Sequence, residues 1–202
     1  VLICTAGADG NSWETEQLPE QLRDISWFPA FSLSPNGEIF CASASAVEGT
    51  DTYEHHMYLV EADGTCREIP ITYPDVDPAS VLLVTESDFT DDGQLAVVFG
   101  MADVREVDLE TGELSENRND SGSFISCLNC VGESVYMLSS SGSGLLRDGQ
   151  YESLSGVLGD QLTEAIRAYE GNEYVKTALC GNAEGYLFFT THEGIFSYVP
   201  GG

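Results

Sequence analysis

The sequence Ser-Leu-Ser-Pro-Asn-Gly at Ser32–Gly37 leads, after a single glutamate, into the apolar run Ile-Phe-Cys-Ala at Ile39–Ala42. The same pattern returns where Asp-Phe-Thr-Asp-Asp-Gly at Asp88–Gly93 precedes Leu95–Phe99. Glycine adopts positive φ at low cost in a tight turn, and branched and aromatic residues favour strands. Each copy therefore predicts a β-hairpin closed at its glycine.

Two further copies follow along the chain. Cys127–Gly132 precedes Val135–Leu138, and Cys180–Gly185 precedes Tyr186–Phe189. Cys66–Ile69 predicts a fourth strand after the first copy, and every hairpin is followed by a third strand with a polar turn, at Tyr58–Gly64, Val107–Gly112, Leu145–Gly149 and Ile195–Gly201. A four-stranded unit of about 40 residues, lengthened in places by insertions, is typical of β-propeller blades.

The turns at Ser34–Gly37 and Thr90–Gly93, together with Val-Asp-Leu-Glu-Thr-Gly at Val107–Gly112, resemble bacterial β-propeller repeat proteins with degenerate YVTN- or WD40-like blades. The resemblance covers most of the chain from Phe31 to Gly202. It extends to propeller regions in surface lipoproteins of Gram-positive gut bacteria, some of them joined to solute-binding domains. It implies a secreted or surface-anchored module, extracellular or at the cell surface of a bacterium.

We expect a single all-β domain over residues 1–202, a β-propeller of about four to five four-stranded antiparallel blades or an arc of a larger propeller. Val1–Leu18 has the pattern of the last two strands of a blade, so we expect the chain to begin within a longer gene product. Asp160–Glu170 carries apolar residues at helical spacing, which predicts one short inserted helix.

Acidic residues dominate the charge. The chain has 34 Asp and Glu against 7 Lys and Arg, a net charge of −27, and Lys176 is its only lysine. Proteins that bind nucleic acid or anionic membranes gain affinity from clustered cations, which this chain lacks. We therefore expect no nucleic-acid partner, and because no apolar run reaches about 18 residues we expect no transmembrane segment.

The spacing of Cys127 and Cys130 is that of half a zinc site or a redox pair. Aligned on the turn glycines, Cys127 takes the position of Asp88, where the repeats place small residues, so packing in the core is favoured over a disulfide or a metal site. Asp88, Asp91 and Asp92 form the densest acidic cluster, which is consistent with a surface turn or with Ca²⁺. No other cofactor is expected.

Aromatic residues and histidines near predicted loops and strand ends are the candidate ligand-binding residues: Trp27, Tyr53, His55, His56 and Tyr151. Flat rings with a polar atom suit sugars and peptide side chains. Adjacent strand residues point to opposite faces, so His55 and His56 do not easily share one ligand. Trp13, Phe28 and Tyr73 are further aromatic candidates of the same kind. The alternative for the whole set is that its members belong to polar surface loops or pack between blades.

Familiar catalytic motifs are missing: there is no Gly-x-Ser-x-Gly, no phosphate-binding Gly-x-x-x-x-Gly-Lys and no His-Glu-x-x-His. The first functional hypothesis is an extracellular ligand- or protein-binding propeller module, linked to carbohydrate or solute capture, whose partner is a glycan, a peptide or another domain of the same protein. The alternative is a propeller-type glycoside hydrolase or lyase that uses carboxylates of the central channel. No catalytic or metal-binding residue is nominated.

Overall fold

The computed structural model describes residues 2–6, 12–25, 27–50, 53–71, 83–119, 122, 124–132, 134–139, 142–147, 150–153, 179–181, 187–191 and 194–198. These residues form antiparallel sheets and one short 3₁₀ turn. The expected helix at Asp160–Glu170 lies outside the described residues.

The first complete sheet has the strand order β3-β4-β5-β6, formed by β3 (Ala30–Leu33), β4 (Ile39–Ala46), β5 (Tyr53–Val60) and β6 (Cys66–Ile69). The turn between β3 and β4 is fixed by Ser34, whose Oγ accepts hydrogen bonds from the backbone N–H groups of Asn36 and Glu38. Gly37 adopts φ of +83° there, as the sequence predicts. We call this sheet blade 1.

Blade 2 has the order β7-β8-β9, with β7 (Val84–Phe89), β8 (Leu95–Phe99) and β9 (Asp103–Val107). Its first turn repeats that of blade 1, because Thr90 Oγ1 accepts from the backbone N–H of Gln94. An isolated bridge between Val107 and Leu114 adds a short outer segment. The two hairpins that the repeated sequence predicts are therefore both present.

Blade 3 has four strands in sequence order, β10 (Ile125–Val131), β11 (Ser134–Ser139), β12 (Gly142–Arg147) and β13 (Gln150–Ser153). The last sheet, blade 4, has three: β14 (Leu179–Gly181), β15 (Leu187–Thr191) and β16 (Gly194–Tyr198). A separate two-stranded sheet, β1 (Leu2–Ala6) and β2 (Trp13–Gln17), precedes the 3₁₀ turn η1 (Glu20–Leu22).

The register of blade 3 corrects one alignment made from the sequence. Cys130 pairs with Val135 as Phe89 pairs with Leu95, so Asn129, rather than Cys127, takes the position of Asp88. The connection between Cys130 and Val135 is one residue shorter than the connection between Phe89 and Leu95, and its closing glycine follows the strand two residues sooner. Alignment on the glycines alone could not detect that difference.

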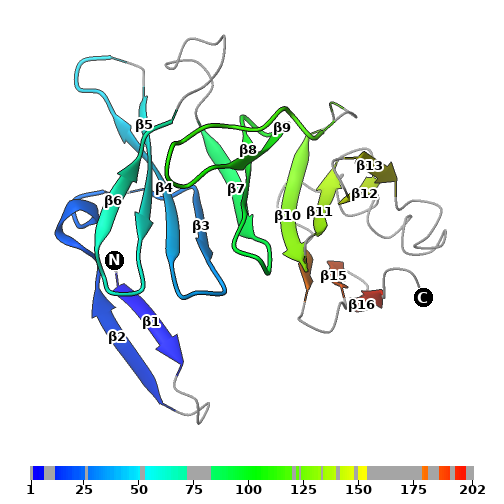
Figure 1. Ribbon diagram of the computed structural model, residues 1–202, viewed down its shortest axis with the longest axis horizontal. Coiled ribbons are helices and arrows are strands. Elements are labelled where there is room, and N and C mark those ends of the chain that lie inside the picture. The colour runs from blue at the N-terminus through cyan, green and yellow to red at the C-terminus, as the bar shows by residue number, and fades with distance from the viewer. Residues whose placement is uncertain are drawn as a thin grey trace.

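The blades follow one another along an arc, and the innermost strands β3, β7, β10 and β14 lie side by side in that order (Figure 1). Blade 2 packs both of its faces on neighbouring blades. In β8, Leu95 and Val97 belong to the core shared with blade 1, whereas Ala96 and Val98 belong to the core shared with blade 3. This explains why β8 is apolar without alternation.

The segment after β2 covers part of the free face of blade 1. Leu18 and Leu22 are buried against Cys41 and Val60, on the face of blade 1 that points away from blade 2. The hairpin β1–β2 extends beyond the lower edge of blade 1 (Figure 1).

Candidate functional site

The two ends of the blades differ in chemistry. One end carries the polar hairpin turns, where Asp91 N–H donates to Gly132 O across the boundary between blades 2 and 3. The opposite end carries the connections into β3 and β10 and the loops β4–β5 and β8–β9. Among the described residues, the large exposed apolar side chains at this end are Trp27, Tyr53, Met101 and Phe124, and we call this set the loop face.

Trp27 and Tyr53 form the centre of the loop face over blade 1. Their rings meet edge to face, with centroids 6.1 Å apart and planes at 74°. The backbone carbonyl of Trp27 accepts from Ala44 N–H at 3.3 Å, which ties the segment before β3 to β4. Both rings stay about half exposed, so the pair presents an apolar surface with two polar atoms to solvent.

His55 lies next to this pair. It follows Tyr53 by two residues, so its side chain is on the same face of β5. The centroids of the His55 and Tyr53 rings are 6.4 Å apart. Burial, and to a lesser extent the neighbouring His56, lowers the pKa of His55, so its imidazole is neutral at physiological pH. Its Nδ1 is buried and has no hydrogen-bond partner within the described residues.

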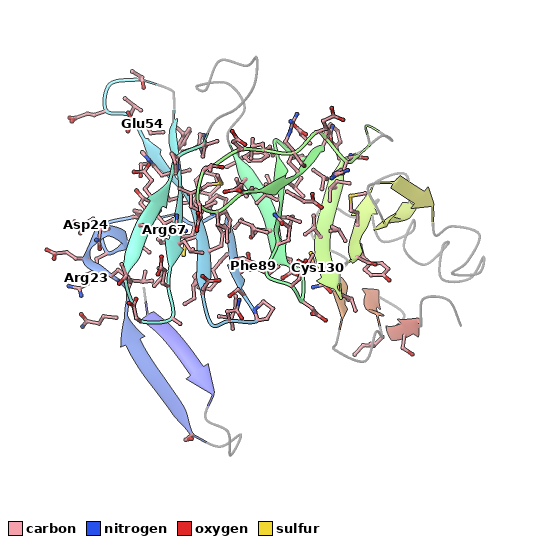
Figure 2. All side chains as sticks on the ribbon, viewed as in Figure 1. Arg23, Asp24, Glu54, Arg67, Phe89 and Cys130 are labelled. Atoms are coloured by element: carbon pink, nitrogen blue, oxygen red, sulfur yellow. The ribbon has the colours of Figure 1, made fainter. Side chains whose placement is uncertain are left out.

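His56 points to the other face of β5, as strand alternation requires. Its Nδ1 lies 2.6 Å from Glu68 Oε1, and its ring stacks on Tyr58 with centroids 6.1 Å apart. The pair of histidines in the sequence therefore contributes to two different surfaces. Figure 2 shows Glu54 at the loop end of β5, whereas Phe89 and Cys130 lie toward the turn end of their strands.

Tyr151 is not part of this group. It lies on β13, the outermost strand of blade 3, where it pairs with Leu146, and its side chain lies outside the described residues, as do those of Trp13 and Tyr73. Phe28 packs under the N-terminal segment instead of on the loop face. The structure thus brings together Trp27, Tyr53 and His55 from the predicted set.

Met101 and Phe124 were missed by the sequence reasoning. They lie close to one boundary between blades, because Ile125 N–H donates to the carbonyl of Met101 at 2.6 Å. Met101 has φ of +83°, a rare conformation for a residue with a side chain. The only available signal was an apolar residue in a connection rather than in a strand.

In the acidic cluster at the β7–β8 turn, the carboxylates of Asp88 and Asp92 accept hydrogen bonds from other groups of the protein. Asp88 Oδ2 accepts from Asn129 Nδ2 and from Cys130 N–H, each at 2.7 Å. Asp92 Oδ1 accepts from the hydroxyl of Thr90. Across the part of the chain that the structure describes, no group of three or more His, Cys, Asp or Glu residues is placed to hold a metal ion.

The described cysteines form no disulfide bonds. Cys41, Cys66, Cys127 and Cys130 are thiols rather than disulfides, and Cys130 packs against the core between blades 2 and 3. Burial raises the pKa of the Cys130 thiol well above its ordinary value. A thiol in that state is a weak nucleophile and a poor metal ligand.

Among the described residues, no helix has the length and the apolar character needed to span a membrane. No protein-family model matches the sequence, and no curated protein matches it.

The fold, by contrast, is shared with solved β-propeller structures. "YCF48 bound to D1 peptide" superposes with a TM-score of 0.60 at 14% identity, over 94% of this chain and 55% of that chain. A chain of the mitotic checkpoint complex gives 0.56 at 14%, over 84% and 45%. A gluconolactonase from Xanthomonas campestris gives 0.52 at 14%, over 96% and 63%.

The chain spans about half the length of the YCF48 chain and of the mitotic checkpoint chain. Their identities are too low to carry more than architecture. Each of the four blades has its strands in sequence order, and the innermost strands of successive blades lie next to one another. This arrangement, shared with the solved structures, is an all-β, β-propeller fold.

Proposed function

We propose that this chain is a binding module whose loop face takes a peptide or protein segment carrying apolar and basic side chains. The observation that carries the proposal is the half-exposed, edge-to-face pair of Trp27 and Tyr53, beside the partly buried, neutral ring of His55. Aromatic side chains of this kind supply much of the binding energy at protein interfaces.

The charge of the chain favours a basic partner. The net charge is −27, and the exposed side chains of Glu48 and Glu54 flank the loop β4–β5 beside Tyr53. A Lys or Arg side chain that lies on the ring of Trp27 or Tyr53 gains a cation–π contact as well as attraction to these carboxylates. An anionic glycan would meet repulsion at the same place.

A peptide also suits the second part of the loop face. Met101 is unbranched and adaptable, and Phe124 offers a flat ring, so the boundary between blades 2 and 3 can receive an apolar side chain. YCF48, which shares the fold, was solved with a peptide bound. An extracellular or cell-surface location and a link to solute or carbohydrate capture remain proposals that rest on the sequence pattern.

The test is a peptide array that varies the number of basic and aromatic residues, followed by titration of the best peptide in solution. The chain has two tryptophans, so the variant Trp13→Phe leaves Trp27 as the only indole reporter. Binding should shift the Trp27 emission to shorter wavelength, because the partner shields the ring from water. Trp27→Ala should weaken binding about tenfold or more, as expected of a central aromatic contact.

Leu33→Ser is the matched control, since it removes an exposed apolar side chain at the turn end of blade 1 and should leave peptide affinity unchanged. The proposal fails if no peptide on the array binds, or if Trp27→Ala binds as tightly as the unmodified chain. Cleavage of a sugar polymer without any peptide binding would favour the hydrolase or lyase hypothesis instead.

A further inference from the structure

The loop ends of blades 1, 2 and 3 carry an apolar side chain at one repeated position. Trp27, Leu83 and Phe124 each lie six residues before the same point of the repeat, where the innermost strand pairs across its hairpin turn; these points are Leu33, Phe89 and Cys130. Hydrogen bonds support the alignment, because the carbonyls of Trp27 and Leu83 accept from Ala44 N–H and Gly100 N–H, at equivalent points of the second strands. We call Trp27, Leu83 and Phe124 the apolar row.

The apolar row contributes little to the core. Trp27 is 46% exposed and Phe124 is 59% exposed, while Leu83 is partly buried. The core contact at each loop end comes from the next residue instead, because Phe28, Val84 and Ile125 each pack into an apolar cluster. Single exposed apolar residues are ordinary, but a repeated row of them at one end of three blades indicates a surface that a partner covers.

Met101 lies beside the row and is costly for folding. Ala102 N–H donates to the carbonyl of Phe99 at 3.3 Å, and both Gly100 and Met101 between them have positive φ, which makes a turn of type I′. Among the described residues, Met101 is the only one other than glycine with positive φ. Because its side chain is 48% exposed, burial does not offset the strain. A strained, exposed apolar residue favours a role in binding.

The spacing of the blades suits an extended chain. Cα atoms of neighbouring innermost strands come within 8 Å of one another along β3, β7 and β10. In an extended peptide, alternate side chains point the same way and lie about 7 Å apart. We propose that an extended peptide crosses the loop ends of blades 1, 2 and 3 and places alternate apolar side chains on Trp27, Leu83 and Phe124, with Met101 beside the last of them.

This inference rests on the peptide-binding function proposed above and adds the conformation of the peptide, the spacing of its apolar residues and the contribution of Leu83. Charge selects a peptide with a flanking basic residue as the occupant. The chain carries a net charge of −27, and Glu54 is exposed next to Tyr53 at the blade 1 end of the row. A second copy of the chain or an anionic lipid surface would be repelled from the same place.

The probes are two nine-residue peptides with an arginine at each end, three leucines and serine elsewhere. In one peptide the leucines are two residues apart, and in the other they are three residues apart. Emission of Trp27 in the Trp13→Phe chain reports binding. The peptide with two-residue spacing should bind about tenfold more tightly, because only its leucines all lie on one side of an extended chain.

Phe124→Ser and Leu83→Ser should each weaken binding of the two-residue peptide about tenfold. When one terminal leucine of the peptide is replaced by serine, Phe124→Ser should lose most of its effect, because both changes remove the same contact. Leu33→Ser, at the turn end of blade 1, is the matched control and should bind the peptide normally. Phe124 is exposed, so far-ultraviolet circular dichroism should show that its variant folds.

Met101→Gly separates a binding role from a structural one. It should raise the urea midpoint, because glycine adopts positive φ without strain, and yet weaken the two-residue peptide about threefold or more. A variant that binds as tightly as the unmodified chain would remove Met101 from the site and contradict the proposal.

Other outcomes overturn the inference while leaving peptide binding intact. If Trp27→Ala weakens binding but Leu83→Ser and Phe124→Ser do not, the peptide contacts blade 1 alone. Tighter binding of the peptide with three-residue spacing would exclude the extended conformation. If Phe124→Ser abolishes self-association in sedimentation and leaves peptide affinity unchanged, a second copy covers the row. Absence of binding by every peptide, on the array and in solution, would instead overturn the proposed function together with this inference.

Discussion

Gly112 closes the polar turn after β9 with φ of +71°, and a Cβ atom there would lie 1.5 Å from the carbonyl oxygen of Pro70. Pro70 directly follows β6, so the turn of blade 2 rests on the outer strand of blade 1. Arg67 reinforces the contact, because its Nη1 donates to the carbonyl of Leu109 at 2.7 Å. A single glycine therefore sets how closely two blades approach.

The variant Gly112→Ala should lower the free energy of unfolding by at least about 3 kcal/mol, since positive φ costs about 1–2 kcal/mol for a residue with a Cβ and the clash with Pro70 adds to it. Gly64→Ala is the matched control: its φ is +85° and nothing lies near its Cβ position, so it should lose only about 1 kcal/mol. Urea unfolding measures both. Equal losses would show that the approach to Pro70 is not tight.

The candidate site could be predicted only in part from single residues. Strand alternation correctly separates His55 from His56, because it needs only local geometry. Contact between Trp27 and Tyr53 depends on the path of the segment before β3 across the end of β4, which no spacing in the sequence encodes. Met101 joins the site through a connection whose conformation is unusual, and such connections have no periodic pattern.

At the scale of elements, Asp88 ties the innermost strands β7 and β10 together. Its carboxylate accepts hydrogen bonds from Asn129 Nδ2, Cys130 N–H and Phe89 N–H. Burial is the largest influence on this group and raises the pKa of Asp88 above its ordinary value, while the three hydrogen bonds oppose that rise. The folded state therefore binds the proton more tightly than the unfolded state does.

The sign of the pH dependence follows from that difference. An acid whose pKa is raised on folding contributes stability below its unfolded pKa of about 3.9, and that contribution is lost as the pH rises through the folded pKa. From pH 4 to pH 7, the unmodified chain should lose stability relative to Asp88→Asn, which cannot titrate. Urea unfolding of both chains across this range checks it, and parallel curves would contradict it.

The hairpins were predictable because their turns are local. The glycines at the turns of blades 1 and 2 and the apolar runs of β4 and β8 need only a few adjacent residues. The register of blade 3 was not predictable, because the closing glycine lies two residues nearer to the first strand than in blade 2, and this places Asn129 in the position of Asp88. Hydrogen bonding between blades, which selects that register, is invisible to a pattern within one blade.

At the scale of the whole molecule, the composition reveals one main destabilising effect, which is repulsion between acidic side chains. Arg67, Arg105 and Arg118 each pair with a carboxylate of their own region, but 7 basic residues cannot neutralise 34 acidic ones. Folding brings the remaining carboxylates closer together than they are in the unfolded chain. Repulsion between them destabilises the compact state.

Added salt should therefore stabilise the fold at pH 7. Exposed charge pairs contribute about 0.2–1 kcal/mol each, so screening several repulsive pairs should raise the unfolding free energy by about 2 kcal/mol between low and high NaCl. Urea unfolding of the unmodified chain, repeated at two protein concentrations, measures this. Near pH 4 many carboxylates are protonated, so the salt effect should shrink. An equal rise at both pH values would assign the effect to apolar burial strengthened by salt rather than to screening of the carboxylates.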